Sequence, residues 1–307
     1  PPMTTKFVTT CGFLCLATVL SAQEPASFVA DKPFACADYS GKKIFLVGAS
    51  GKVEWEYASG TCNELWVLPN GNLLFNTGFG VKEVTRDKQT VFEYTSQSEI
   101  YACQRLANGN TFVGECSSGR LLELTPDGRV VKELRLLPEG TDGGHVYMRN
   151  ARQLANGHYL VTHYGQEKVC EYDPQGQCVW QVAAPGGPHT AVRLPDGHTL
   201  IATGDKRKDP RLSEVDADGK VVWELSNQDL PGAPLKFLTG FHRLPNGNTL
   251  ISNWLGHGQF GAGPHLLEIT PDKQLVWSYA NHSDMRTISA VQVLDAESRV
   301  LPGETLR

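Results

Sequence analysis

The chain of 307 residues lacks the features that mark several large classes of protein. Its formal net charge is −5 and its pI is about 6.0, whereas a nucleic-acid-binding protein would need a basic face. A glycine-rich phosphate loop, a GxSxG elbow and an HExxH motif are all absent. No CxxC pair or Cys/His zinc spacing occurs either. The sequence therefore gives no signature of nucleotide, serine-hydrolase or zinc chemistry, and we expect no bound cofactor, no metal and no nucleic acid.

Hydrophobic runs long enough to cross a bilayer as a helix are also missing. The longest apolar stretch covers 14 positions from Phe7 to Leu20, follows Lys6 and ends in the small residues Ser21 and Ala22. This order is typical of a secretory signal peptide. We therefore expect residues 1–22 to be a signal peptide, with two extra residues before Met3, and residues 23–307 to form one domain. The protein is then secreted or periplasmic and is not inserted in a membrane.

One phrase returns five times along the chain. LPNGN begins at Leu68, and LANGNTFV, LANGHYLV, LPDGHTLI and LPNGNTLI begin at Leu106, Leu154, Leu194 and Leu244. A second phrase follows each copy, for example DADGKVVWEL. An Asn-Gly or Asp-Gly pair between β-rich flanks predicts a tight hairpin. Each repeat thus predicts four antiparallel strands, a to d, which is the pattern of a propeller blade.

The two ends of the repeat region predict how the ring closes. The segment Pro33–Tyr57 aligns with strands b, c and d of a blade but lacks strand a. The segment Ser289–Asp295 resembles a strand a with no complete blade after it. Joining the two leaves no open sheet edge. We therefore predict an all-β, six-bladed propeller whose first blade is closed by the C-terminal strand, and we expect a monomer.

The repeats resemble a known family. LPNGNTLI paired with DADGKVVWEL is similar to the quinoprotein-type (PQQ-like) and arylsulfotransferase-type propeller repeats of exported bacterial proteins, and the resemblance covers the chain after Gln23. Related quinone enzymes use pyrroloquinoline quinone, but no cofactor motif accompanies the repeat here. Related arylsulfotransferases carry sulfuryl between phenols on a histidine near the propeller axis. The resemblance implies the fold more strongly than the activity.

Function is expected on one rim of the ring. The hairpin turns on one rim are nearly identical, whereas the connections on the other rim vary in length and composition; we call this rim the variable face. Variable loops on a rigid scaffold commonly carry binding and catalysis. The residue five positions before each repeat leucine enters strand a at this face, which gives Asn63, Tyr101, Arg149, His189, Thr239 and Ser289. Strand-b ends and loops add His145, His163, Asp205, Lys206, Asn253, His257 and Arg286.

These residues support two hypotheses of different class. In the first, the variable face binds an anionic or carbohydrate-like small molecule or oligosaccharide, with ligand-binding residues Asn63, Tyr101, His145, Arg149, His189, Asp205, Lys206, Asn253, His257 and Arg286. In the second, the protein is an enzyme of arylsulfotransferase or polysaccharide-lyase type, with catalytic residues His189, Arg149 and His163. A variant of the second uses His145, His163 and His189 as metal ligands.

Cysteines and tryptophans lead to structural expectations. Six cysteines remain after the signal peptide, and Cys170–Cys178 and Cys103–Cys116 each flank a hairpin turn. In an oxidising compartment these pairs could form disulfides, but six free thiols are an equal alternative. Tryptophan recurs at one place in strand d, at Trp55, Trp180, Trp223 and Trp277. We expect these rings to pack between blades.

Overall fold

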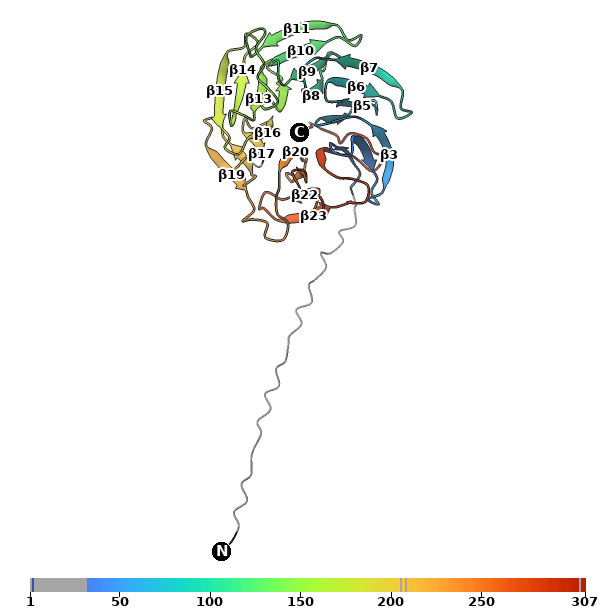
Figure 1. Ribbon diagram of the computed structural model, residues 1–307, viewed down its shortest axis with the longest axis vertical. Coiled ribbons are helices and arrows are strands. Elements are labelled where there is room, and N and C mark those ends of the chain that lie inside the picture. The colour runs from blue at the N-terminus through green and yellow to red at the C-terminus, as the bar shows by residue number, and fades with distance from the viewer. Residues whose placement is uncertain (1, 3–31, 205, 208, 304) are drawn as a thin grey trace.

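A computed structural model of the protein describes residues 2, 32–204, 206–207, 209–303 and 305–307. The expected signal peptide lies, except for Pro2, outside the described residues. Twenty-four strands of the described chain form six four-stranded antiparallel sheets around a central axis (Figure 1). This confirms the predicted all-β, six-bladed propeller. None of the described segments forms a helix that could cross a membrane.

The first three blades follow one another from the N-terminal side of the chain. From the axis outwards, blade 1 consists of β24 (Ile288–Val293), β1 (Phe34–Asp38), β2 (Lys43–Val47) and β3 (Val53–Ala58). Blade 2 consists of β4 (Leu65–Val67), β5 (Leu73–Asn76), β6 (Gly80–Val84) and β7 (Thr90–Thr95). Blade 3 consists of β8 (Ile100–Arg105), β9 (Thr111–Glu115), β10 (Arg120–Leu124) and β11 (Val130–Arg135).

The other three blades complete the ring in the same order. Blade 4 consists of β12 (Asn150–Gln153), β13 (Tyr159–His163), β14 (Lys168–Tyr172) and β15 (Cys178–Ala183). Blade 5 consists of β16 (Pro188–Arg193), β17 (Thr199–Thr203), β18 (Leu212–Val215) and β19 (Val221–Leu225). Blade 6 consists of β20 (Leu238–Arg243), β21 (Thr249–Asn253), β22 (Leu266–Ile269) and β23 (Leu275–Tyr279).

The C-terminal strand closes blade 1, as predicted. β24 pairs antiparallel with β1, with Ala35 opposite Gln292. All six residues of β24 are buried, and Ile288, Val291 and Val293 pack in one cluster with Phe34 and Trp277. Blade 1 therefore joins the two ends of the repeat region and leaves no inner edge unpaired.

A carboxylate in strand c links neighbouring blades. Glu83 accepts a hydrogen bond of 2.6 Å from Asn72, in the turn between β4 and β5 of the same blade, and one of 2.5 Å from Arg105 in blade 3. The corresponding sites in blades 4 and 5 replace the turn asparagine by histidine, in His158–Glu171–Arg193 and His198–Glu214–Arg243. The grouping of Asp196, His198 and Glu214 is therefore this recurring structural contact.

Three tryptophans of strand d contact the next blade, as expected. The indole N–H groups of Trp55, Trp180 and Trp223 donate to backbone carbonyls of Arg86, Ala217 and Pro271, at 2.7, 2.8 and 2.7 Å. Each acceptor lies in the c–d turn of the following blade. Trp277 is buried against Phe34 instead, and its N–H has no partner among the described residues. The repeated tryptophan side chain therefore connects neighbouring blades by packing. Three of these four tryptophans also connect them by a hydrogen bond.

The six cysteines after the expected signal peptide are all free thiols in the structure. Five are buried and Cys178 is exposed. Cys170 lies opposite Gln181 and not opposite Cys178, and Cys103 lies opposite Val113. Of the two alternatives for the hairpin cysteines, the structure has the free thiols, and it contains neither of the two disulfides.

The end of the chain lies in the central channel (Figure 1). Leu306 pairs with Arg243 at the end of β20, and the carbonyl of Arg307 accepts a 2.8 Å hydrogen bond from Arg152. Glu64 lies beside both arginines, at 2.7 Å from Arg152 and 3.8 Å from Arg307. All three side chains are buried. Residues 305–307 thus fill the channel below the variable face.

Candidate functional site

A cavity of about 350 Å³ opens at the channel mouth on the variable face. Five of the six residues that enter strand a line it, namely Asn63, Tyr101, Arg149, His189 and Thr239. The sixth, Ser289, is fully buried, and its hydroxyl donates to the carbonyl of Cys62 at 2.6 Å. His145 and His257 from the loops complete the polar lining. The repeat register thus brings residues from separate blades to one site.

Arg149 is the cation of the cavity. Its guanidinium carbon lies 4.4 Å from the ring centre of Tyr101 and 5.0 Å from that of Tyr164. One Nη1–H donates to the carbonyl of His145. Although Arg149 is only 7% exposed, no carboxylate among the described residues lies within ion-pair distance of it. Two aromatic faces therefore cover a guanidinium whose charge is not neutralised by a described acid.

His189 offers a hydrogen-bond acceptor to the cavity. Its Nδ1 lies 2.8 Å from the carbonyl oxygen of Thr239, and since a carbonyl can only accept, Nδ1 carries the proton and Nε2 keeps its lone pair. Burial and, second, the charge of Arg149 lower the pKa of His189 to about 3. The imidazole is therefore neutral at pH 7. The hydroxyl of Thr239 is buried without a partner among the described residues.

His145 is oriented by an acid that the sequence did not single out. Its Nδ1 lies 2.6 Å from Oε2 of Glu99, which belongs to the connection between β7 and β8. The carboxylate accepts, so Nδ1 donates and Nε2 is left unprotonated in the neutral ring. The side chain of His145 is 56% exposed, and its ring centre lies 5.8 Å from that of Tyr101.

Two of the expected site residues are fully buried and do not line the cavity. His163 is fully buried, with Nδ1 at 3.1 Å from the Tyr147 carbonyl and Nε2 at 2.8 Å from the Tyr172 hydroxyl, and burial lowers its pKa to about 4. Asn253 is also fully buried; its Oδ1 accepts from the backbone of Lys236 at 2.7 Å. Both side chains are hydrogen-bonded to the backbone of loops. His163 therefore does not form a metal-ligand set with His145 and His189.

Three further expected residues lie at the margin or outside the described part. Lys206 pairs with Glu167 at 3.4 Å and lies 5.6 Å from the Tyr164 ring. The guanidinium of Arg286 lies 5.3 Å from the Phe260 ring. Asp205 is outside the described residues. Lys206 and Arg286 therefore border the cavity through the aromatic rings that line it.

Apart from Tyr101, the aromatic wall of the cavity was not expected from the sequence. It consists of Tyr39, Tyr101, Tyr164, Phe237, Trp254 and Phe260. Phe237 lies 5.6 Å from the His189 ring and 5.3 Å from the Trp254 ring, both edge to face. Tyr39, Tyr164 and Trp254 each follow the last residue of a strand b directly. Their position in the repeat was therefore a signal that could have identified them.

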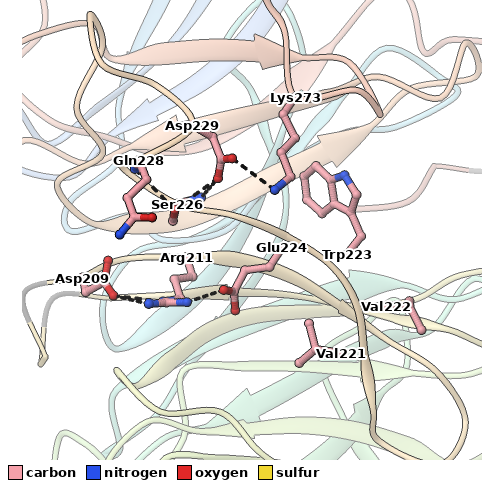
Figure 2. A pocket seen from close by; sticks show the side chains of 10 residues that line it. All are labelled: Asp209, Arg211, Val221, Val222, Trp223, Glu224, Ser226, Gln228, Asp229 and Lys273. Carbon is pink, nitrogen blue, oxygen red and sulfur yellow. Dashed lines mark hydrogen bonds and ion pairs between the residues drawn. The ribbon is translucent and has the colours of Figure 1, made fainter.

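A second hollow, of about 470 Å³, lies on the outer flank between blades 5 and 6 (Figure 2). Arg211 is held between Asp209 and Glu224, and Lys273 pairs with Asp229 at 3.1 Å. Both cations of this hollow are thus paired with its acids, and none of its lining residues belongs to the channel mouth. The axial cavity is the better candidate for the functional site, because its buried cation, Arg149, is not paired with an acid among the described residues.

Comparisons with known proteins support the fold. The family model of outer membrane protein assembly factor BamB, a PQQ-like model, matches residues 140–253. A protein of unknown function from Bacteroides caccae is 25% identical, with a TM-score of 0.76, over 86% of this chain and 99% of that one. A catalytically inactive variant of virginiamycin B lyase from Staphylococcus aureus, with quinupristin, is 14% identical, with a TM-score of 0.56, over 82% and 85%. No curated protein matches. The matches support a PQQ-like β-propeller.

Proposed function

We propose that the protein is an exported binding protein that holds a small, ring-shaped, anionic molecule, such as an acidic sugar or a short oligosaccharide, in the axial cavity. The observation that carries the proposal is Arg149, a guanidinium at the cavity wall without a described acid to neutralise it. An anionic group of a ligand would supply the missing charge, and charge-assisted hydrogen bonds are among the strongest that a binding site offers.

The geometry of Arg149 favours a planar carboxylate. Tyr101 and Tyr164 cover the guanidinium faces, and Nη1 is used by the His145 carbonyl. Of the remaining donors, those on Nε and Nη2 form an edge that can pair with two oxygens of one carboxylate. The aromatic wall would cover the apolar face of a sugar or other ring, as is usual in small-molecule sites.

Hydroxyl groups of the ligand would find partners on the other side of the cavity. Nε2 of His189 accepts a hydrogen bond, and Asn63 can both donate and accept. These polar groups match an acid that carries several hydroxyl groups better than an acid that carries none. Export of the protein is supported by the apolar N-terminal run and by the BamB family match.

Isothermal titration with glucuronate, galacturonate, glucose and 4-nitrophenyl sulfate tests this function. We expect the two uronates to bind and glucose to bind about ten- to a hundred-fold more weakly, since one charge-assisted contact contributes about 1.5–3 kcal/mol. Arg149→Lys should weaken uronate binding by a similar factor, whereas Arg211→Lys in the outer hollow should leave it unchanged. Equal affinity for glucose and glucuronate contradicts the carboxylate site, and preference for the sulfate assigns the anion to another class.

A further inference from the structure

The axial cavity contains a group arrangement that binding alone does not require. Glu99 and His145 form a carboxylate–imidazole pair at 2.6 Å, and His145 lines the same cavity as Arg149. A carboxylate that orients Nδ1–H leaves Nε2 as a base and stabilises the imidazolium that forms when the base takes a proton. This pairing is the usual way in which a protein prepares a general base.

The base and the cation are joined through the backbone. The carbonyl of His145 accepts from Nη1 of Arg149 and from the thiol of Cys116 at 3.3 Å. The backbone N–H of Cys116 in turn donates to the carbonyl of Glu99 at 2.7 Å. Acid, base and cation thus share one hydrogen-bonded frame, so a carboxylate on Arg149 would be held at a fixed place relative to Nε2 of His145.

We infer that the Glu99–His145 pair removes the proton from the carbon next to the carboxylate of a bound uronate, and that the protein cleaves acidic oligosaccharides by β-elimination. This inference rests on the proposed binding of a carboxylate by Arg149. The C–H bond breaks and its proton goes to Nε2 of His145, while its electron pair forms the new C=C bond. The C–O bond to the leaving sugar breaks, and the leaving oxygen takes the proton back from the imidazolium. The products are an unsaturated uronate and an alcohol, and no co-reactant is consumed.

Other reaction classes fit the described residues less well. Glycoside hydrolysis ordinarily uses two carboxyl groups flanking the bond, and no Asp or Glu is among the described residues that line the cavity. The hydroxyl of Ser40 is 2.9 Å from that of Thr287 and has no imidazole partner among the described residues, so no serine nucleophile is activated there. Burial lowers the pKa of His189 to about 3, so its imidazole is a poor base near neutral pH. Proton abstraction next to a carboxylate needs one base and one cation, and the cavity supplies both.

Incubation of the full chain with galacturonate and glucuronate trimers tests the inference, with the near-ultraviolet absorbance of the unsaturated acid as the readout. Exchange of the carbon-bound proton in D2O, followed by NMR, measures the first step independently. We expect turnover and exchange in the wild type. His145→Gln should lower kcat by about 10²- to 10⁴-fold while changing the dissociation constant of glucuronate by less than about threefold. His158→Gln, which alters a histidine–glutamate pair outside the cavity, should keep kcat within about threefold.

Glu99→Gln distinguishes a positioning role from a merely structural one. The groups that face His145 are Glu99, Arg149, Tyr101 and His189. Without the Glu99 carboxylate, Nδ1–H of His145 loses the acceptor that holds the ring, so kcat should fall by about tenfold or more while KM changes by less than about threefold. An unchanged kcat would overturn the role of Glu99.

The outcomes separate the inference from the proposed function. If uronates bind but neither the absorbance nor the exchange appears, the elimination is wrong and the binding function stands. If His145→Gln keeps full turnover, the base has been assigned incorrectly. If no uronate binds to the wild type, both the carboxylate site and the elimination are refuted. If His145→Gln fails to bind glucuronate, that variant is unfolded or its cavity is blocked, and the change of kcat against KM in Glu99→Gln then tests the base.

Discussion

Glu64 offers a quantitative test of the buried channel. Its carboxylate lies 2.7 and 3.2 Å from the Arg152 guanidinium and 3.8 Å from that of Arg307. The side chains of Glu64, Arg152 and Arg307 are 3%, 8% and 3% exposed. Glu64→Gln keeps the shape but leaves two buried guanidinium groups without a carboxylate side chain. Breaking a buried ion pair by removing one partner costs about 3–5 kcal/mol. Because glutamine still accepts a hydrogen bond, we expect the lower end of that range.

Equilibrium urea unfolding followed by tryptophan fluorescence measures this loss. The matched control is Glu56→Gln, which breaks the exposed Lys43–Glu56 pair of 3.0 Å and should cost less than about 1 kcal/mol. Combining Glu64→Gln with Arg152→Met should cost less than the sum of the two single changes, because each removes the same interaction. A Glu64→Gln protein as stable as the Glu56→Gln control would refute the reasoning.

Two further predictions concern the stability of the ring. Deleting the residues after Thr287 removes β24 and exposes the β1 edge. The loss of buried Ile288, Val291 and Val293, at about 1.5–3 kcal/mol each, is comparable to the whole stability of a domain. Circular dichroism should therefore show an unfolded chain, and a native melting curve would contradict the closure of blade 1 by β24. Burial lowers the pKa of His163 and His265 to about 4 and that of His189 and His242 to about 3. These histidines take up protons more readily when unfolded, so the free energy of unfolding should be highest above pH 6.5 and decrease towards pH 4, by up to about 1.4 kcal/mol per pH unit for each histidine. Urea unfolding of His242→Gln at several pH values should show a dependence of the unfolding free energy on pH that is smaller by one proton. An unchanged pH dependence would contradict a neutral, buried His242.

The repeat made the fold predictable from the sequence. Each Asn-Gly and Asp-Gly turn sets the register of a hairpin, so the positions of the strands follow from the five copies of one phrase and the hairpin phrase that accompanies them. The missing strand a at one end and the unpaired strand a at the other then determine the closure. The same register placed Asn63, Tyr101, Arg149, His189 and Thr239 at the channel mouth, because residues at equivalent places in symmetric blades lie on one ring.

The rest of the site depends on features that the register does not contain. Side chains alternate between the two faces of a strand, so at the end of strand b one residue holds the loop and the next faces the cavity. His163 and Asn253 hold loops, whereas Tyr164 and Trp254 line the cavity. Glu99, Phe237 and His257 come from connections without a repeat pattern, and their meeting depends on the three-dimensional course of the loops.

A crystal structure of the wild-type protein soaked with glucuronate tests the proposed carboxylate site. We expect the ligand in the axial cavity, with its carboxylate on the Nε and Nη2 edge of Arg149, its ring against Tyr101 or Trp254, and a hydroxyl within hydrogen-bond distance of Nε2 of His189. An empty axial cavity, with glucuronate bound in the outer hollow of blades 5 and 6 or not bound at all, would contradict it.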